Sequence, residues 1–411
     1  MHKQPTSNRI SQLKELEPET EPQKAVVIAI FRGRLGLLNI RQDWKEITDR
    51  MLGRRHYFHL WEWHRDYLET LVDDPDEAFF LVAYRAKIPM AVLPLCSSTM
   101  KQNWCELKIL KLPHHKHMSL SDMICDPSPE HADIPGHLIE HLRSSMRTGW
   151  DMLLMRGILA ESSTMSRWWA AVPRPRIQLV QDRCDTLSCV AYDELLGNVS
   201  KNFRNNLRKA RNKLAKLPET KFDFVREPAL LPEAFSHFIR VEASGWKGDK
   251  GTGTAIGLHE QLRSFYGKLM NSFGATGSCQ INLLRVGDEC IAGQFCLRLD
   301  ATLYILKIGY SENHSHLAPG NMLLEECIRQ SLMDVDPIQN WNLISGVSWH
   351  NDWKPSHEAV CDLWIYNRTL RGLVLYGWGA GVRLCRSIFR ELRKRPTIVG
   401  VRNQCATAGA V

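Results

Sequence analysis

Long apolar segments are absent from this chain of 411 residues. No apolar run reaches the ~18 residues that a transmembrane helix needs, so we predict none. The first 24 residues are polar and charged, and the apolar run at 25–31 is too short for the core of a signal peptide. We therefore expect a cytoplasmic protein whose residues 1–24 are disordered.

Closely spaced cysteine pairs are also missing, because none of the 12 cysteines forms a C-x-x-C motif. Without an export signal, we interpret the cysteines as reduced, mostly buried thiols. The histidines in the sequence HHKH at 114–117 are possible metal ligands, but no cysteine or carboxylate stands near them at a zinc-finger or H-E-x-x-H spacing. We interpret these residues as a polar loop and predict no metal.

The composition is ordinary for a globular protein, with 44% hydrophobic residues and a net charge of +8. This charge permits an anionic partner without requiring one. The length is sufficient for two domains. Apolar periodicity predicts helices at 58–71, 135–148, 200–217, 232–242 and 258–273.

One pattern occurs twice. LVAYRAKIPMAVLPL at 81–95 and INLLRVGDECIAGQFCL at 281–297 each combine a strand, a charged turn and a second strand, and each follows a helical stretch. This repetition predicts two copies of one unit. Alternating helices and strands place the chain in the α/β (α+β) class, with mixed twisted sheets flanked by helices.

The predicted organisation has four parts: a disordered segment at 1–24, one unit at 25–190, a second at 191–366 and a basic C-terminal helix and tail at 367–411. Residues 383–395 carry a dense group of basic side chains. Such an amphipathic segment can lie on an anionic membrane, which here means peripheral attachment to the inner membrane face. The alternative is a helix that packs on its own domain.

Residues 303–332 read LYILKIGYSENHSHLAPGNMLLEECIRQSL. A strand-like run ends at Tyr310, a polar loop follows, and Pro319-Gly320 begins a predicted helix. The first N–H groups of a helix lack partners, and the helix dipole makes that end positive, so it can bind phosphates. A plain connection between strand and helix remains the alternative on spacing alone.

Five stretches, in this order, resemble the CelD/BioF2-like acetyltransferases of the GNAT superfamily, which are related to the FemABX aminoacyltransferases. They are SKNFRNNLRKARNKL (200–214), EASGWKGDKGTGTAI (242–256), GQF (293–295), YSENHSHLAPGNMLL (310–324) and Gly346 followed by Trp353-Lys354. The resemblance covers roughly 25–366 and implies two tandem GNAT-like domains, the second with an acyl-CoA site.

The resemblance also implies where acyl-CoA binds. A central strand at 304–310 offers backbone groups to pantetheine, and a loop with a helix start holds the pyrophosphate. The residues so assigned are Leu306, Lys307, Ile308, Leu317, Ala318, Pro319, Gly320 and Asn321. The usual loop has a basic or Gln residue first and a Gly fourth. This chain has Ser-His-Leu-Ala-Pro-Gly at 315–320, which departs from that pattern at both positions.

Acyl transfer to an amine needs a group that accepts a proton, a polarised thioester oxygen and a leaving thiolate. Glu242 is our candidate base, with His350 and Asp352 as alternatives. Lys354 is a candidate for the oxyanion or for an anionic substrate, and Tyr310 for protonation of the thiolate. Each also has a purely structural interpretation, as a surface, loop or packing residue.

Candidate substrate contacts come from two regions. Trp246, Lys247, Gly253 and Thr254 belong to a loop rich in glycine and threonine, and such loops often approach a ligand closely. Arg204 lies on a basic predicted helix that would contact an anionic substrate or a tRNA acceptor end, or would be solvated. Few aromatics interleave with its basic residues, which argues against a dedicated nucleic-acid surface.

We therefore predict an acyl-CoA-dependent acyltransferase acting on an amine or hydroxyl of a small-molecule or saccharide acceptor. The resemblance associates it with bacterial exopolysaccharide or cell-envelope metabolism. One alternative is a FemABX-like transferase that uses aminoacyl-tRNA. The other is a catalytically degenerate GNAT fold that binds a partner or a membrane.

Overall fold

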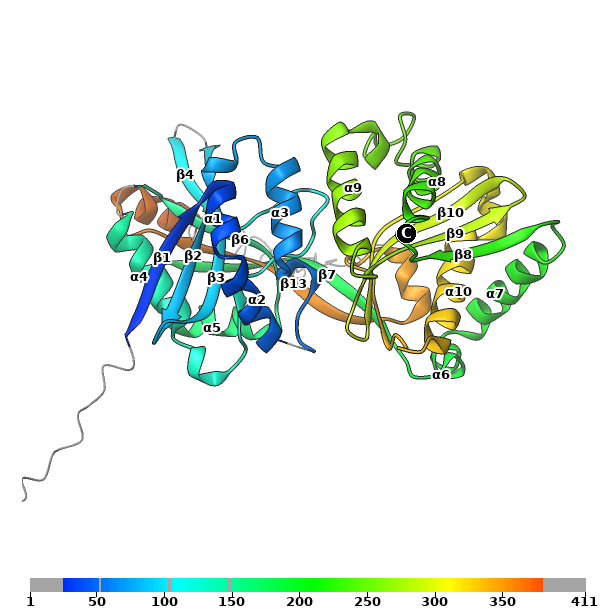
Figure 1. Ribbon diagram of the computed structural model, residues 1–411, viewed down its shortest axis with the longest axis horizontal. Helices are drawn as coiled ribbons and strands as arrows, with labels where there is room; N and C mark the ends of the chain where they lie inside the picture. Colours follow the sequence, from blue (N-terminus) through cyan, green and yellow to red (C-terminus); the bar gives the residue numbers. More distant parts are fainter. Residues whose placement is uncertain (1–24, 52, 103–104, 147–148, 380–411) are drawn as a thin grey trace, which may run out of the picture.

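The computed structural model describes residues 25–51, 53–102, 105–146 and 149–379, which form two lobes around one sheet (Figure 1). Segment 383–395 lies outside these ranges. Within them, every helix is too short or too polar to span a bilayer.

The first unit runs from β1 to β7. Its elements are β1 (Val26–Arg32), α1 (Gly33–Asn39), α2 (Arg41–Arg50), η1 (Tyr57–His59), α3 (Trp61–Thr70), η2 (Pro75–Glu77), β2 (Ala78–Arg85), β3 (Ile88–Gln102), β4 (Cys105–Lys111), β5 (Ile124–Cys125), η3 (Pro129–His131), α4 (Ile134–Ser145), β6 (Met152–Leu159), α5 (Ser163–Ala171) and β7 (Arg176–Ser188), where η marks a short 3₁₀ helix.

The second unit continues to β13. Its elements are α6 (Tyr192–Asn198), α7 (Lys201–Leu214), β8 (Thr220–Val225), α8 (Leu231–Ser244), η4 (Ile256–Leu258), α9 (Glu260–Gly274), β9 (Cys279–Val286), β10 (Glu289–Leu299), β11 (Thr302–Tyr310), η5 (Glu312–Leu317), α10 (Pro319–Met333), β12 (Asn340–Asn342), η6 (Ser348–Trp353) and β13 (Ser356–Tyr366).

The two units repeat one topology. In each, four antiparallel strands (β1–β4 and β8–β11) lead through a helix (α4 or α10) to a fifth strand that is parallel to the fourth (β6 or β12). Helices between the first two strands (α1–α3 and α8–α9) cover one face. The predicted α/β fold of two similar units, with mixed twisted sheet flanked by helices, is therefore confirmed.

The last strand of each unit pairs with the other unit. Strand β7 of the first unit is antiparallel to β12 of the second, and β13 of the second is antiparallel to β6 of the first. Strands β7 and β13 also pair with each other along most of their length. This exchange joins the units into one sheet of order β1-β2-β3-β4-β6-β13-β7-β12-β11-β10-β9-β8.

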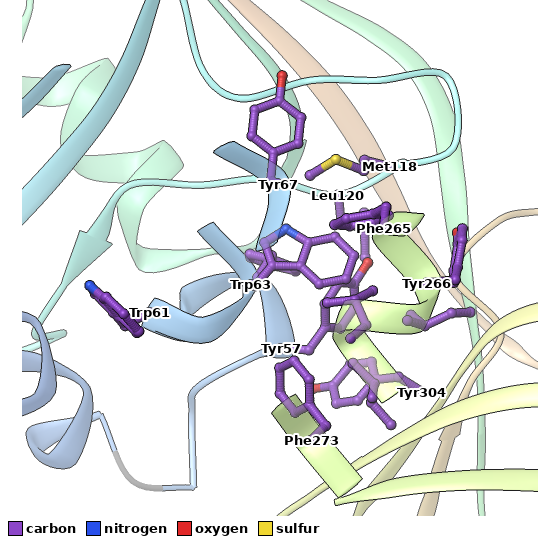
Figure 2. Packing of buried hydrophobic residues seen from close by; sticks show 14 of the residues in the cluster. Tyr57, Trp61, Trp63, Tyr67, Met118, Leu120, Phe265, Tyr266, Phe273 and Tyr304 are labelled. Atoms are coloured by element: carbon purple, nitrogen blue, oxygen red, sulfur yellow. The ribbon is translucent and has the colours of Figure 1, made fainter. Parts of the chain in front are cut away.

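Aromatic side chains also join the units, where α3 packs against α9. The ring centroid of Trp63 lies 5.3 Å from that of Phe265 and 4.6 Å from that of Tyr57 (Figure 2). The Tyr57 ring in turn lies 5.1 Å from that of Tyr304 on β11. Buried aromatic contacts of this kind stabilise an interface beyond their area alone, so β11 has a fixed position relative to the first unit.

The predicted helices and hairpins are present with shifts of a few residues. Strand β12 ends at Asn342, and residues 343–347 connect it to η6. The cysteines whose burial the structure describes are free thiols, and of these only Cys290 is not buried.

Candidate active site

The sheet opens between β11 and β12. The two strands pair only over Thr302–Tyr304 and Asn340–Asn342, whereas β11 continues to Tyr310. Beyond Tyr304, β11 therefore has no strand partner on its β12 side, and the backbone groups on that side are available to a ligand, except for the Ile308 carbonyl, which Lys247 engages. Two adjoining cavities lie at this opening.

Cavity A lies between β11 and the start of α10. Its volume of ≈ 380 Å³ falls within the ~300–1,000 Å³ typical of ligand sites. It is lined by Trp246, Ala292, Gly293, Gln294, Ile308, Gly309, Tyr310, Ser315, Ala318, Pro319, Gly320, Asn321, Leu323, Val347 and Trp349.

The start of α10 is open toward cavity A. The helix has no side-chain cap and no acidic residue in its first turn, so its first N–H groups and its positive dipole end are uncompensated. A Cβ on Gly320 would have only Tyr310 Cδ1 near it, at 4.0 Å. Ala318 has a left-handed backbone with φ of 50°, a conformation that favours glycine. Ala318 thus has the backbone conformation expected of the glycine that usually occupies this position of the loop.

Cavity B, of ≈ 190 Å³, continues from cavity A toward the first unit. Trp246, Gln294, Ile308, Val347 and Trp349 line both cavities. The remaining residues around cavity B are Ser119, Lys247, Ile305, Leu306, Lys307, Leu324, Leu343, Ile344, Ser345 and His350. The junction of the two cavities is therefore formed by side chains from four separate segments of the second unit.

Glu242 is buried on α8 behind this junction. Its Oε2 accepts a hydrogen bond from the Ile256 N–H at 2.7 Å, and its Oε1 accepts one from Lys247 Nζ at 3.3 Å. Lys247 Nζ also donates to the Ile308 carbonyl at 2.7 Å. Because an ammonium group has three donors, one remains for cavity B. Glu242 thus reaches the cavity through Lys247.

Gln294 ends a chain of buried amides on β9 and β10. Gln280 Nε2 donates to Asn282 Oδ1 at 2.7 Å, and Asn282 Nδ2 donates to Gln294 Oε1 at 2.9 Å. The Gln294 oxygen is therefore engaged, and its Nε2 donor is left for the junction of cavities A and B. The sequence pattern GQF gave a signal for this residue that we did not use.

A β-bulge directs Lys307 into cavity B. Phe295 and Cys296 on β10 pair with Lys307 and Ile305, which leaves Leu306 as the extra residue. Lys307 Nζ lies 6.0 Å from the ring centroid of Tyr266. The pKa of Lys307 is lowered to about 8, mainly by burial and also by the charge of Lys247, while the charge of Glu242 opposes the shift.

His350 borders cavity B and is held by the first unit. Its Nδ1 lies 2.9 Å from Asp185 Oδ2, while His357 Nδ1 lies 2.7 Å from Asp185 Oδ1. Burial lowers the pKa of His350, although Asp185 and the Ser345 backbone act in the opposite direction. Through its contact with Asp185 on β7, His350 holds η6 to the first unit. No sequence motif points to Asp185.

The structure brings together only part of the predicted site. All the residues assigned to acyl-CoA border cavity A or B except Leu317, which is buried in the core. Tyr310, His350, Trp246 and Lys247 also border them.

Five predicted residues lie elsewhere. Asp352 and Lys354 are exposed and border neither cavity, and Arg204 is exposed on α7, where it donates to the Leu196 carbonyl. Gly253 and Thr254 also lie outside both cavities. The tight folding of the loop on itself requires a glycine at 251, since a Cβ there would lie 1.9 Å from the Trp246 carbonyl oxygen.

No group of three or more His, Cys, Asp or Glu in the described ranges could hold a metal ion.

Comparison with known proteins identifies the fold. Residues 201–334 match the model of an acetyltransferase (GNAT) domain. None of the curated proteins matches this sequence. The crystal structure of FemX is similar with a TM-score of 0.55 and 9% identity, over 81% of this chain and 98% of that chain.

A conserved protein of unknown function from Bacteroides thetaiotaomicron has a TM-score of 0.50 and 14% identity, over 80% of this chain and 97% of that chain. A tandem GNAT protein from the clavulanic acid biosynthesis pathway has a TM-score of 0.46 and 9% identity, over 82% of this chain and 98% of that chain. Residues 201–334 thus match a GNAT acetyltransferase domain and line most of cavity A and part of cavity B, to which Ser119 and residues 343–350 also contribute.

Proposed function

We propose that this protein is a CelD/BioF2-like acyltransferase that moves an acyl group from acyl-CoA to an amine or hydroxyl of a small-molecule or saccharide acceptor. We propose that this reaction belongs to exopolysaccharide or cell-envelope metabolism. The observation that carries the proposal is the opening between β11 and β12, with the uncapped start of α10 at one end and the Glu242–Lys247 pair behind it.

In this proposal the donor lies in cavity A. Its pyrophosphate binds the N–H groups at the start of α10, and the pantetheine arm follows the unpaired backbone of β11. The thioester then reaches the junction of cavities A and B, where Gln294 Nε2 donates a hydrogen bond to its carbonyl oxygen. A donor directed at the developing oxyanion stabilises the transition state.

The acceptor approaches from cavity B. Its nitrogen or oxygen forms a bond to the thioester carbon, and the carbon–sulfur bond breaks as the tetrahedral intermediate collapses. The proton of the acceptor passes to Lys247 while Lys247 gives a proton to Glu242, so the carboxylate is the final proton acceptor. Tyr310, on the wall of cavity A, supplies a proton to the departing thiolate.

The aminoacyl-tRNA-dependent alternative has one observation in its favour. Ser315 and Ala318 stand where the CoA loop usually has a basic or Gln residue and a glycine, which weakens the case for a bound pyrophosphate.

Membrane attachment through residues 383–395 is a further proposal, and deletion of that segment followed by vesicle sedimentation tests it.

Isothermal titration with acetyl-CoA and longer acyl-CoAs tests the donor site, on the wild type and on Gly320→Asp. The new side chain enters open space, and an aspartate in the first turn of a helix is favourable, so the variant should fold. The matched control is Gly197→Asp at an exposed position on α6, where a Cβ also meets no atom within 4 Å.

We expect micromolar binding by the wild type and the control, and at least a tenfold loss in Gly320→Asp, because a carboxylate would occupy the phosphate position. If no acyl-CoA binds the wild type, the acyl-CoA proposal fails. Salt-sensitive binding of aminoacyl-tRNA would then favour the alternative.

A further inference from the structure

The loop between β4 and β5 lies against cavity B, although it belongs to the first unit. Its apolar side chains Met118 and Leu120 are buried in the core that both units share, near Trp63 and Phe265 (Figure 2). The Ser121 N–H donates to the Gly157 carbonyl at 3.0 Å, which fixes the loop to β6. The position of this loop is therefore fixed.

The loop also carries the polar residues His115, His117 and Ser119. The His117 N–H donates to His115 Nδ1 at 3.2 Å, and Ser119 borders cavity B. The pKa of His117 is lowered to about 3, mainly by burial and also by the nearby charge of Lys307. The loop predicted to be only a polar connection thus lies next to β11.

Lys307 has no ionic partner. No carboxylate or carbonyl in the described part of the chain accepts a hydrogen bond from its Nζ, whereas Lys247 is paired with Glu242. The neighbouring His115 and His117 have lowered pKa values, burial being the largest cause, and are neutral at pH 7. The wall of cavity B therefore carries one uncompensated cation, and a half-buried cation without a partner favours a bound anion.

A third cavity, cavity C, lies against the same loop of the first unit. It adjoins cavity B at Ser119, which borders both, and includes His114, Lys116, Arg156 and Asp182. Arg156 Nε lies 3.6 Å from Asp362 Oδ2. Cavity C thus has both acidic and basic side chains, and the unpaired positive charge lies deeper, at Lys307.

We propose that cavity B binds an acceptor that carries an anionic group, a carboxylate or a phosphate, close to the amine or hydroxyl that is acylated, with Lys307 as its ionic partner and Ser119 as a neutral polar contact. This inference rests on the proposed acyltransferase function. It adds no bond-making step, and it makes the first unit part of the acceptor site.

Isothermal titration of the full chain with two matched pairs of amines tests it. Phosphoethanolamine is compared with ethanolamine, and β-alanine with propylamine. The variants are Lys307→Met, which keeps a long side chain without charge, and Lys307→Arg, which keeps the charge. Lys209→Met, at an exposed lysine on α7, is the matched control. Acetyl-CoA is titrated into the same preparations, so a failure of the donor site is detected separately.

We expect the anionic member of at least one pair to bind the wild type, Lys307→Arg and Lys209→Met at least tenfold more tightly than its neutral partner. Lys307→Met should lose this preference and retain acetyl-CoA binding. The pair that shows the effect identifies phosphate or carboxylate. Absence of any preference in the wild type, or a preference that Lys307→Met leaves intact, overturns the proposal even where acetyl-CoA binds.

Discussion

Gly309 on β11 lies directly against Glu242 on α8. A Cβ on Gly309 would lie 2.5 Å from the Cα and 2.9 Å from the N of Glu242. Gly309 pairs in register with Gly293, where a Cβ would meet the Phe238 ring at 2.9 Å. Two paired glycines therefore allow α8 to approach the sheet closely enough for Glu242 to reach Lys247.

Substitution of Gly309 by alanine should separate this helix from the sheet. We expect Gly309→Ala to lower the free energy of unfolding by about 1–3 kcal/mol, as overpacking does, and to reduce turnover because Glu242 moves. Urea denaturation measures the first effect. Gly267→Ala on α9, where no atom lies within 4 Å, should instead be neutral or stabilising by up to about 1 kcal/mol. Equal stability of the two variants would contradict this account.

Gln294→Leu should remove the proposed oxyanion donor while keeping the volume of the side chain. We expect kcat to fall by about 10²–10³, as when one such donor is lost elsewhere, with acyl-CoA affinity nearly unchanged. Single-turnover kinetics alongside calorimetry separate these quantities. A variant that loses acyl-CoA binding and turnover together would show that Gln294 supports the cavity wall instead.

Glu242→Gln should lower turnover by about 10²–10⁴, the range of general base catalysis. The pH profile distinguishes a base from an anchor for Lys247: a base variant loses the acidic arm of the wild-type profile, whereas an anchor variant keeps its shape at a lower rate. Glu233→Gln, at the exposed start of the same helix, is the matched control and should have wild-type activity.

Lys307→Met should stabilise the protein at pH 7. Burial lowers the pKa of Lys307 from 10.5 to about 8, so the unfolded chain binds more protons than the folded chain between these two values. The wild-type free energy of unfolding therefore rises with pH in that window. We expect the variant to be more stable by about 1–3 kcal/mol at pH 7 and to lose this advantage toward pH 10.5.

Urea denaturation at a series of pH values checks this prediction, with Lys209→Met as the variant that should show no difference. A Lys307→Met protein that is less stable than the wild type at pH 7 would mean that the ammonium group has a stabilising partner. The groups facing Lys307 are Lys247, Glu242, His115 and His117.

Asp185→Asn should weaken the connection between the units. Asp185 is fully buried, contacts His350 and His357, and lies 3.1 Å from Arg183 Nε. Loss of its charge leaves Arg183 without this partner, and we expect a loss of about 3–5 kcal/mol. The exposed Asp182 on the same strand gives the control, Asp182→Asn. Calorimetric unfolding that is identical for both variants would contradict the prediction.

Local features of the fold were predictable from the sequence because they depend on nearby residues. Ser200 stands before α7 and accepts a hydrogen bond from the Phe203 N–H at 3.1 Å, as its position suggested. Pro319 begins α10 and the two hairpins have charged turns, so apolar periodicity and capping located these elements. The acyl-CoA residues came from the family resemblance, and most of them border a cavity.

The rest depends on contacts between distant residues. The apolar pattern of β13 shows a strand but not that its partners lie in the first unit. Lys307 was assigned for its backbone alone, since a bulge decides where its side chain points. The loop at 114–117 looked like a simple connection because β11, its neighbour, comes about 190 residues later.

The exchanged strands also bear on how the chain is made by a ribosome. Strand β6 ends at Leu159 and its neighbour β13 begins at Ser356, so one edge of the first unit stays unpaired while nearly 200 more residues are synthesised. At about 5–20 residues per second this takes roughly 10–40 s. During that time the nascent protein exposes a hydrophobic strand edge that can pair with other chains. Folding of the first unit is thus completed only when translation is almost finished.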